Sequence, residues 1–140
     1  MSGALQAMPV ASTRSTIIVA EDNDMVRGYF VDVLEVAGYE VLAAGDGLGA
    51  FELLRERPDA RVLLTDIEMP GMDGLALAHR ARAYSRDIDV LYVSGGDREK
   101  VARQAVPGSL FLAKPCMSKV LCEAVAGMLD KKQRTVAEAA

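Results

Sequence analysis

The sequence predicts an α/β fold in which a doubly wound, five-stranded parallel sheet carries helices on both faces. The first observation is that five short apolar runs alternate along the chain with five segments of helical periodicity. The second is that runs such as IIVA, VLYV and LFLA are apolar without interruption, as expected for strands buried on both faces. The third is the length of 140 residues, which suits one domain.

The strands are predicted from short runs that are apolar or alternate between apolar and polar residues. They cover residues 15–20, 39–44, 61–66, 88–94 and 109–113. The second run ends in AAGDG, which offers little chemistry, and its strand is expected at the edge of the sheet. Because helices connect the strands, we expect parallel pairing, and right-handed crossovers place the helices on both faces.

The helices are predicted from apolar residues that recur at three- and four-residue intervals. They cover residues 23–37, 46–57, 75–84, 97–105 and 118–130. Gly38 ends the first helix and Pro58 ends the second. We therefore expect a flexible N-terminal tail over residues 1–14, one domain over residues 15–130 and a C-terminal tail over residues 131–140.

Charge and composition exclude several classes of protein. A net charge of −4 gives no electrostatic footprint for direct binding to nucleic acid. No apolar stretch approaches the roughly 18 residues needed to cross a membrane, and the N-terminus lacks the pattern of a signal peptide. Cys116 and Cys122 fit neither a metal-binding spacing nor a disulfide framework. We expect a cytoplasmic protein with free thiols and no membrane contact.

Polar side chains follow four of the five predicted strands. Glu21 and Asp22 follow the first strand, Asp66 ends the third, Ser94 the fourth, and Lys114 follows the fifth. The carboxyl ends of parallel strands share one rim, where doubly wound folds bind their ligands, so these groups are expected to converge. Three carboxylates would repel one another without a cation, and their hard oxygen atoms suit Mg²⁺.

This set of groups is what phosphoryl transfer to a carboxylate requires. Asp66 can act as the nucleophile and form an acyl phosphate, while the protein positions groups and neutralises charge. Asp22 and Asp66 would hold Mg²⁺, Glu21 would act through a water, and Lys114 would supply a point charge. Ser94 would donate its hydroxyl to a phosphoryl oxygen. The segment MPGMDG is expected to turn sharply after Asp66, which presents the backbone carbonyl of Glu68 as a further metal ligand.

Four motifs, VAEDN, TDIEMPGMDG, YVSGG and LAKP, resemble those of the receiver domains of two-component response regulators, and the resemblance covers about residues 15 to 130. It implies the strand order 2-1-3-4-5, as in flavodoxin-like and CheY-like folds. It also implies that a histidine kinase or a histidine phosphotransfer protein phosphorylates Asp66. The segment VSGG resembles the corresponding segment in receiver domains of hybrid sensor histidine kinases.

The resemblance also assigns roles to single residues. Asp22, Asp66 and the Glu68 carbonyl would bind Mg²⁺ with help from Glu21, and Ser94 and Lys114 would contact the phosphoryl group. Lys114–Pro115 would be a cis peptide bond. Phe111, three residues before Lys114, matches the aromatic switch residue that turns inward as Ser94 moves towards phosphate. The family more often has tyrosine there, and Phe111 lacks its hydroxyl.

We expect contacts with other proteins both for phosphorylation by a kinase and for output to a downstream partner. Met25 and Tyr29 stand outside the buried stripe of the first helix, one turn apart and beside the rim, and are predicted to dock a kinase helix. Phosphate on Asp66 is expected to favour one of two arrangements of the Ser94 loop and Phe111. Output would then pass to an unknown downstream protein, along a phosphate relay, or to a domain beyond this sequence. We expect a signalling switch that catalyses only its own phosphotransfer and dephosphorylation, and not an enzyme that acts on other substrates.

Four alternatives remain open from the sequence. The chain could be the phosphate-relay receiver module of a hybrid histidine kinase. An aspartate-dependent phosphatase would need an acid two residues after the nucleophile, and Glu68 has that spacing, but DIEMP lacks the Asp-x-Asp and the following Thr of that family. A flavin- or nucleotide-binding protein is disfavoured because EDND would repel phosphate after the first strand. A phosphate-independent scaffold is disfavoured by Asp22, Asp66 and Lys114.

Overall fold

The computed structural model describes residues 14–96 and 98–139, with side chains described as far as residue 130. The predicted N-terminal tail lies outside this range up to residue 13, as do Asp97 of the predicted helix 97–105 and Ala140.

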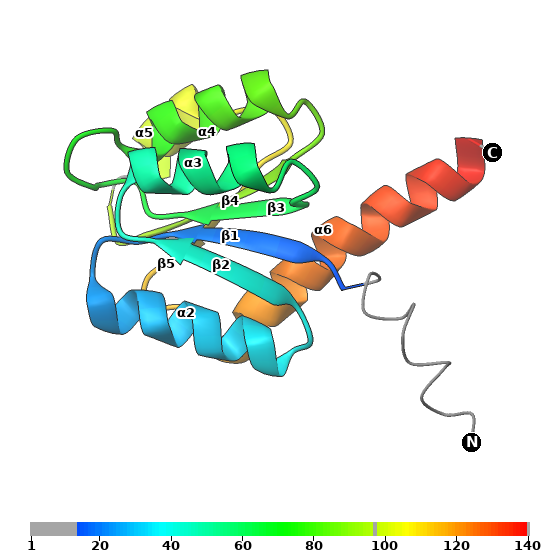
Figure 1. The fold of residues 1–140 in the computed structure, drawn as a ribbon, viewed down its shortest axis with the longest axis horizontal. Helices are drawn as coiled ribbons and strands as arrows, with labels where there is room; N and C mark the ends of the chain where they lie inside the picture. The colour runs from blue at the N-terminus through cyan, green and yellow to red at the C-terminus, as the bar shows by residue number, and fades with distance from the viewer. Residues whose placement is uncertain (1–13, 97, 140) are drawn as a thin grey trace.

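The described chain forms one parallel sheet in the order β2-β1-β3-β4-β5, which confirms the predicted fold class and strand order (Figure 1). Its strands are β1 (Thr16–Ala20), β2 (Glu40–Ala44), β3 (Val62–Thr65), β4 (Asp89–Ser94) and β5 (Leu110–Ala113). Their bounds differ from the predicted ranges by one residue at most at each end. The order reverses at β1, which pairs with β2 on one side and with β3 on the other.

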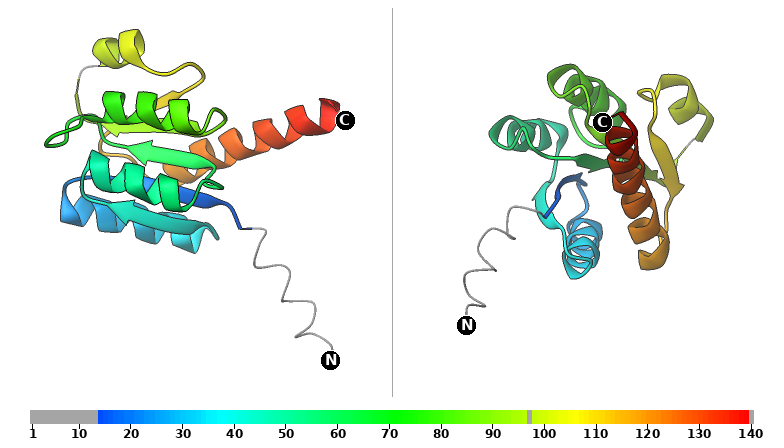
Figure 2. Two further views of the ribbon diagram at one scale, coloured as in Figure 1. Left: turned by 45° about the horizontal axis from the view of Figure 1, so that its top comes forward. Right: turned by 90° about the vertical axis from the view of Figure 1, so that its right-hand side faces the viewer.

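Helices cover both faces of the sheet, as predicted (Figures 1 and 2). They are α2 (Asp24–Val36), α3 (Gly47–Glu56), α4 (Gly74–Tyr84), α5 (Arg98–Gln104) and α6 (Ser118–Ala139). Three of them begin at a side chain that accepts a hydrogen bond from the first turn, namely Asn23, Asp46 and Asp73. Such caps satisfy backbone N–H groups that have no partner within the helix.

The alternation of side chains along each strand divides the core into two layers. In β1, Ile17 and Val19 pack with α2 and α6, whereas Ile18 and Ala20 pack with α3, α4 and α5. All four side chains are fully buried. Burial on both faces explains the uninterrupted apolar runs of β1, β3 and β4 and leaves the ends of the strands as the place for polar chemistry. The prediction was wrong for LFLA, because β5 lies at the edge of the sheet and is only partly buried.

The last helix is longer than predicted. We expected it to end at Asp130, but α6 continues to Ala139 and projects beyond the sheet (Figure 1). The backbone of residues 131–139, the predicted C-terminal tail, continues this helix. The segment contains no glycine or proline that would stop a helix, and Lys, Gln, Arg, Glu and Ala all have good helix propensity.

A polar network fastens the amino end of the sheet, opposite the predicted site. Glu40 of β2 accepts hydrogen bonds from Arg57 Nη1 at 2.9 Å and from Thr16 Oγ1 at 2.9 Å. Arg57 also pairs with Asp59 at 3.0 Å. The hydrogen bonds from Arg57 and Thr16 lower the pKa of Glu40 to about 2. The network therefore joins β1, β2 and the end of α3 through a carboxylate that stays ionised in moderate acid.

Candidate functional site

Three carboxylates meet where β1 and β3 end. Glu21 and Asp22 follow β1 directly and Asp66 follows β3, and the two strands are neighbours paired through Ala20 and Thr65. One oxygen of each carboxylate lies within 4.8 Å of one oxygen of the other two. Glu21 is fully buried and Asp66 is nearly so, whereas Asp22 is exposed. Buried carboxylates this close together need a cation to compensate their charge.

Hydrogen bonds from the start of α2 and from the residue before it hold the loop that carries Glu21 and Asp22. Oε2 of Glu21 accepts a hydrogen bond from the backbone N–H of Asn23 at 3.1 Å. Arg27, one turn into α2, donates to the Glu21 carbonyl at 2.9 Å and to Asp24 Oδ1 at 2.7 Å. Sequence reasoning missed Arg27. Its three-residue spacing from Asp24 was the available signal, because that spacing brings two side chains together on a helix.

Lys114 supplies the positive charge expected at the rim. Its ammonium donates to Glu21 Oε1 at 2.8 Å and to Asp66 Oδ2 at 3.2 Å. Burial disfavours the charged form, but the hydrogen bond to Glu21 and the charges of Asp66 and Glu21 outweigh it and raise the pKa of Lys114. The peptide bond between Lys114 and Pro115 is cis, as the resemblance implied.

The segment after Asp66 turns back sharply, as predicted. Backbone N–H of Ile67 donates to Asp66 Oδ1 at 2.7 Å, so this oxygen is held while Oδ2 faces Lys114. Gly71 has a positive φ of 79°, which favours glycine. At Gly74, a Cβ atom would overlap the carbonyl oxygen of Asp66. Gly74 was not identified as a site residue from the sequence. The available signal was that MPGMDG contains a second glycine, after Gly71, immediately before a predicted helix.

Ser94 lies at the end of β4, the strand next to β3. It is 3% exposed, and its Oγ accepts a hydrogen bond from the backbone N–H of Gly96 at 3.1 Å. A Cβ atom at Gly96 would lie 3.5 Å from that Oγ and 3.8 Å from Oε2 of Glu68. The carboxylate of Glu68 therefore lies beside the Ser94 loop. The role of the Glu68 carbonyl as a metal ligand stays a prediction.

Phe111 occupies the middle of β5. Its side chain is partly buried and packs against the core layer formed with α3, α4 and α5. The guanidinium carbon of Arg98, the first residue of α5, lies 4.9 Å from the centroid of the Phe111 ring. The face of the ring thus contacts a cation, and Phe111 lacks the hydroxyl that a tyrosine would carry at the ring edge. Its role as a switch stays a prediction.

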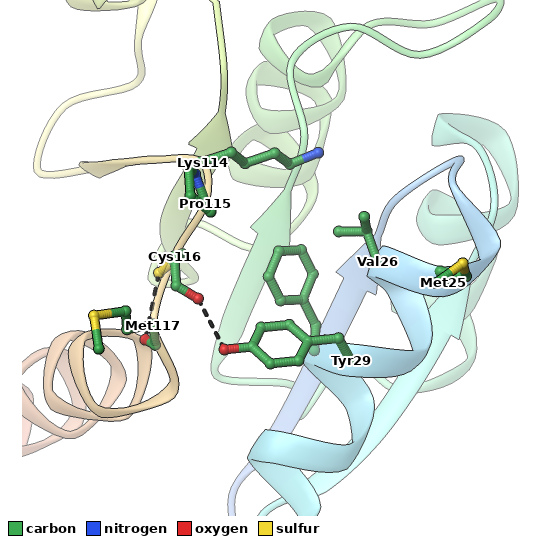
Figure 3. A pocket seen from close by; sticks show the side chains of 8 residues that line it. Met25, Val26, Tyr29, Lys114, Pro115, Cys116 and Met117 are labelled. Atoms are coloured by element: carbon green, nitrogen blue, oxygen red, sulfur yellow. Dashed lines mark hydrogen bonds between the residues drawn. The ribbon is translucent and has the colours of Figure 1, made fainter.

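The predicted docking residues line an apolar groove between α2 and the segment that joins β5 to α6 (Figure 3). The groove has a volume of about 610 Å³ and begins at Lys114. Met25 is 85% exposed and Tyr29 is 39% exposed. Figure 3 shows the Tyr29 hydroxyl pointing across the groove to the carbonyl of Cys116, a hydrogen bond of 2.9 Å. Contact with a kinase at this groove stays a prediction.

This sheet order, with acids and a lysine at one rim, defines a signalling domain of the receiver class. Residues 17–126 match the response regulator receiver domain family, and the chain belongs to that family. The resemblance noted in the sequence is thus confirmed. In the described residues, every helix is too short or too polar to cross a lipid bilayer.

Relatives include a receiver protein, a sensor kinase and a chemotaxis protein. The response regulator receiver protein CpdR of Brucella abortus is 43% identical over 79 residues, which are 56% of this chain and 65% of CpdR. The sensor kinase CckA of the same organism is 34% identical over 124 residues, 86% of this chain but 13% of the kinase. The chemotaxis protein CheY1 of Helicobacter pylori is 33% identical over 112 residues, 76% of this chain and 90% of CheY1.

Solved structures show the same arrangement. A response regulator receiver protein from Sinorhizobium medicae superposes with a TM-score of 0.80 at 31% identity, covering 85% of this chain and 97% of that one. The receiver domain of the hybrid histidine kinase CckA superposes with a TM-score of 0.72 at 35% identity, covering 82% and 99%. The fold therefore corresponds to these receivers over nearly their whole length.

Proposed function

We propose that this chain is a phosphorylatable receiver that takes a phosphoryl group onto Asp66 from a phosphohistidine of a histidine kinase or a histidine phosphotransfer protein. One observation carries the proposal. The ammonium of Lys114 contacts both Asp66 and the buried Glu21 inside the acidic cluster. A carboxylate beside a lysine and a cluster of oxygen ligands is suited to binding and neutralising a phosphoryl group.

The donor set fits Mg²⁺. Among the described residues, Glu21, Asp22 and Asp66 present three carboxylates and Lys114 presents one ammonium that contacts two of them, so three negative charges face one positive charge. Carboxylate oxygens, together with the proposed Glu68 carbonyl, are the hard ligands that Mg²⁺ prefers. When bound there, the ion would neutralise charge on the phosphoryl oxygens.

The residues of the chain divide the remaining work. An oxygen of Asp66 attacks the phosphorus atom, the P–N bond to the donor imidazole breaks, and its electron pair returns to the imidazole nitrogen. Lys114 Nζ donates a hydrogen bond to Asp66 Oδ2 in this structure. It is therefore positioned to contact a phosphoryl oxygen and neutralise its charge once the phosphoryl group is attached to Asp66. Ser94 Oγ accepts from Gly96, which leaves its hydroxyl proton for another phosphoryl oxygen.

The apolar groove beside the site suits a partner helix. Met25 and Tyr29 of α2 and Met117, the residue before α6, expose apolar surface along it. Lys114, which contacts Asp66, also lies at this groove (Figure 3). A helix that buries its apolar face there would bring its phosphohistidine to the acidic rim.

A relay role is the second candidate. The 34% identity to the sensor kinase CckA and the likeness to the CckA receiver support a receiver that passes phosphate on to another protein. Under either role, the chain catalyses only its own phosphotransfer and dephosphorylation, and it switches contacts with a downstream protein. Membership of the receiver family favours both roles over the aspartate-dependent phosphatase. We place the protein in the cytoplasm with its two-component partners.

Intact mass measurement tests the proposal. We expect incubation with phosphoramidate and Mg²⁺ to add one phosphoryl group to the wild type and none to Asp66→Asn. Asp73→Asn is the matched control, because Asp73 lies in the same loop and caps α4, and asparagine caps a helix equally well. Phosphorylation that survives in Asp66→Asn, or its absence from the wild type, would refute the proposal.

A further inference from the structure

The contact between Arg98 and Phe111 links the loop after Ser94 to the middle of β5. Arg98 is the first residue of α5, and its guanidinium carbon lies 4.9 Å from the centroid of the Phe111 ring. We propose that Arg98 is a positioning residue that holds Phe111 in the arrangement seen here and so slows the uptake of phosphate by Asp66. The inference rests on the proposed function, since it concerns the regulation of that site.

The chemistry of the pair suits a weak, reversible restraint. A phenylalanine ring has no hydroxyl, so only its face and its apolar surface can hold it in place. The guanidinium over that face interacts with the negative side of the ring quadrupole. Because the arginine is exposed, such a contact shifts an equilibrium by about two- to fivefold. This is enough to set a switching ratio without locking the ring.

The chain connects this restraint to the phosphorylation site. Ser94 and Phe111 lie on neighbouring strands, where Tyr92 pairs with Phe111 and Ser94 with Ala113. Only residues 95–97 separate Ser94 from Arg98. The Ser94 hydroxyl now accepts from Gly96. If Ser94 moves towards a phosphoryl oxygen while its Oγ still accepts from Gly96, the backbone at Gly96 moves with it, and Arg98 begins the next helix along the chain.

The carboxyl end of α5 has its own anchors. His79 Nε2 is 2.7 Å from the carbonyl oxygen of Gln104, and Arg82 donates to the carbonyl of Pro107 at 2.8 Å. Both residues belong to α4. Backbone N–H of Val106 also donates to the buried Tyr92 hydroxyl at 3.3 Å. A displacement at Ser94 would therefore move the amino end of α5, where Arg98 contacts the ring, more than the carboxyl end.

Three variants test the inference. Arg98→Gln removes the cation but keeps a long polar side chain, whereas Arg98→Lys keeps a cation. Arg103→Gln, an exposed arginine of the same helix, is the matched control. We expect Arg98→Gln to be phosphorylated by phosphoramidate about two- to fivefold faster than the wild type. Arg98→Lys should lie between them and Arg103→Gln should match the wild type.

The partner of Arg98 is tested separately. In a Phe111→Leu background, Arg98→Gln should no longer change the rate, because the ring face is gone. Proton NMR of the unphosphorylated wild type should show the Arg98 side-chain protons shifted upfield by the ring. An unchanged or slower rate in Arg98→Gln, the same gain in the Phe111→Leu background, or the absence of the upfield shift would overturn the inference.

The two proposals fail in different ways. If the wild type shows the upfield shift but takes up no phosphate, the proposed function is refuted and the regulatory role of Arg98 falls with it. If the wild type takes up phosphate on Asp66 and Arg98→Gln does so at the same rate, only the role of Arg98 is refuted.

Discussion

The ammonium of Lys114 donates a hydrogen bond of 2.8 Å to Oε1 of Glu21, a residue 93 positions earlier in the chain. The two residues follow β5 and β1, which are separated in the sheet by β3 and β4. The lysine side chain therefore spans the rim and passes Asp66 on the way, at 3.2 Å from its Oδ2. One cation thus ties together the strand ends that form the site.

Removing that cation should cost stability that Mg²⁺ can restore. Lys114→Met leaves the buried carboxylates of Glu21 and Asp66 without their ammonium partner, so we expect the free energy of unfolding to fall by about 2 kcal/mol in the absence of Mg²⁺. Urea denaturation with and without Mg²⁺ measures the effect. Mg²⁺ should stabilise Lys114→Met more than the wild type, because a bound cation compensates the same carboxylates.

Lys119→Met, an exposed lysine at the start of α6, controls for the loss of a positive charge in general. If both variants lose the same stability and respond equally to Mg²⁺, Lys114 does not compensate the acidic cluster.

A side chain at Gly74 should displace Asp66. In Gly74→Ala the new Cβ would overlap the Asp66 carbonyl, and relief of that overlap must move the backbone of the phosphoacceptor loop. We expect a loss of about 1–3 kcal/mol in the free energy of unfolding and slower phosphorylation by phosphoramidate under conditions where the variant is folded. Urea denaturation and a phosphorylation time course measure the two effects.

Gly127→Ala is the control for that substitution. Gly127 lies within α6 with open space around its Cβ position, so alanine there should stabilise the protein by about 1 kcal/mol and leave phosphorylation unchanged. A Gly74→Ala protein as stable and as readily phosphorylated as the wild type would show that the close approach to Asp66 is not needed.

The Glu40 network should make stability depend on pH in acid. The pKa of Glu40 is lowered from 4.5 to about 2 in the folded protein. Between these values the unfolded state binds more protons, so the stability that Glu40 contributes is complete above pH 4.5 and is lost as the pH falls towards 2. The difference in unfolding free energy between the wild type and Glu40→Gln should therefore shrink below pH 4.5.

Urea denaturation at several pH values between 2 and 7 measures this difference. Glu52→Gln removes an exposed carboxylate that pairs with Arg55 on α3, and serves as the control. A difference between wild type and Glu40→Gln that stays constant through this range would contradict the assignment.

Charges in the apolar groove should block the partner but not the chemistry. Met25→Glu with Tyr29→Glu places two carboxylates in a surface proposed to bury the apolar face of a helix. We expect phosphotransfer from a histidine kinase or phosphotransfer protein to slow at least tenfold, while labelling by phosphoramidate stays within about twofold.

Leu48→Glu charges an equally prominent apolar residue, 62% exposed, on α3 at the other face of the sheet. It should affect neither reaction. Equal loss with the protein donor and with phosphoramidate in the Met25/Tyr29 variant would show that these residues support the fold or the site instead of a partner.

Most of the fold could be predicted from the sequence because the three central strands, β1, β3 and β4, are buried on both faces. Runs such as IIVA and VLYV predict buried strands, and their alternation with helices predicts a parallel sheet, whereas the strand order was implied by the resemblance to receiver domains. The predicted end of the last helix at Asp130 was wrong, because the prediction placed it where the apolar periodicity ends. Residues 131–139 contain no glycine or proline that would stop a helix. Propensity alone extends the helix.

The site was predictable in its groups but not in its contacts. That Glu21, Asp66 and Lys114 share a rim follows from the topology of parallel strands. The spacing of Asp24 and Arg27 indicated their pairing, but the contacts of Arg27 with the Glu21 carbonyl and of Arg98 with Phe111 depend on side-chain directions and on loops, which no periodicity encodes. Gly74 was missed for a related reason, since its need to lack a Cβ arises from a backbone eight residues earlier folding back against it.

The most direct test of the central claim is to locate the phosphoryl group chemically. Borohydride reduces an acyl phosphate on aspartate to homoserine, so peptide mass spectrometry after phosphorylation and reduction reports the modified position. We predict homoserine at position 66, dependent on Mg²⁺ and greatly reduced in Lys114→Met. Homoserine at another aspartate, or none at all under conditions that phosphorylate a known receiver, would contradict the account.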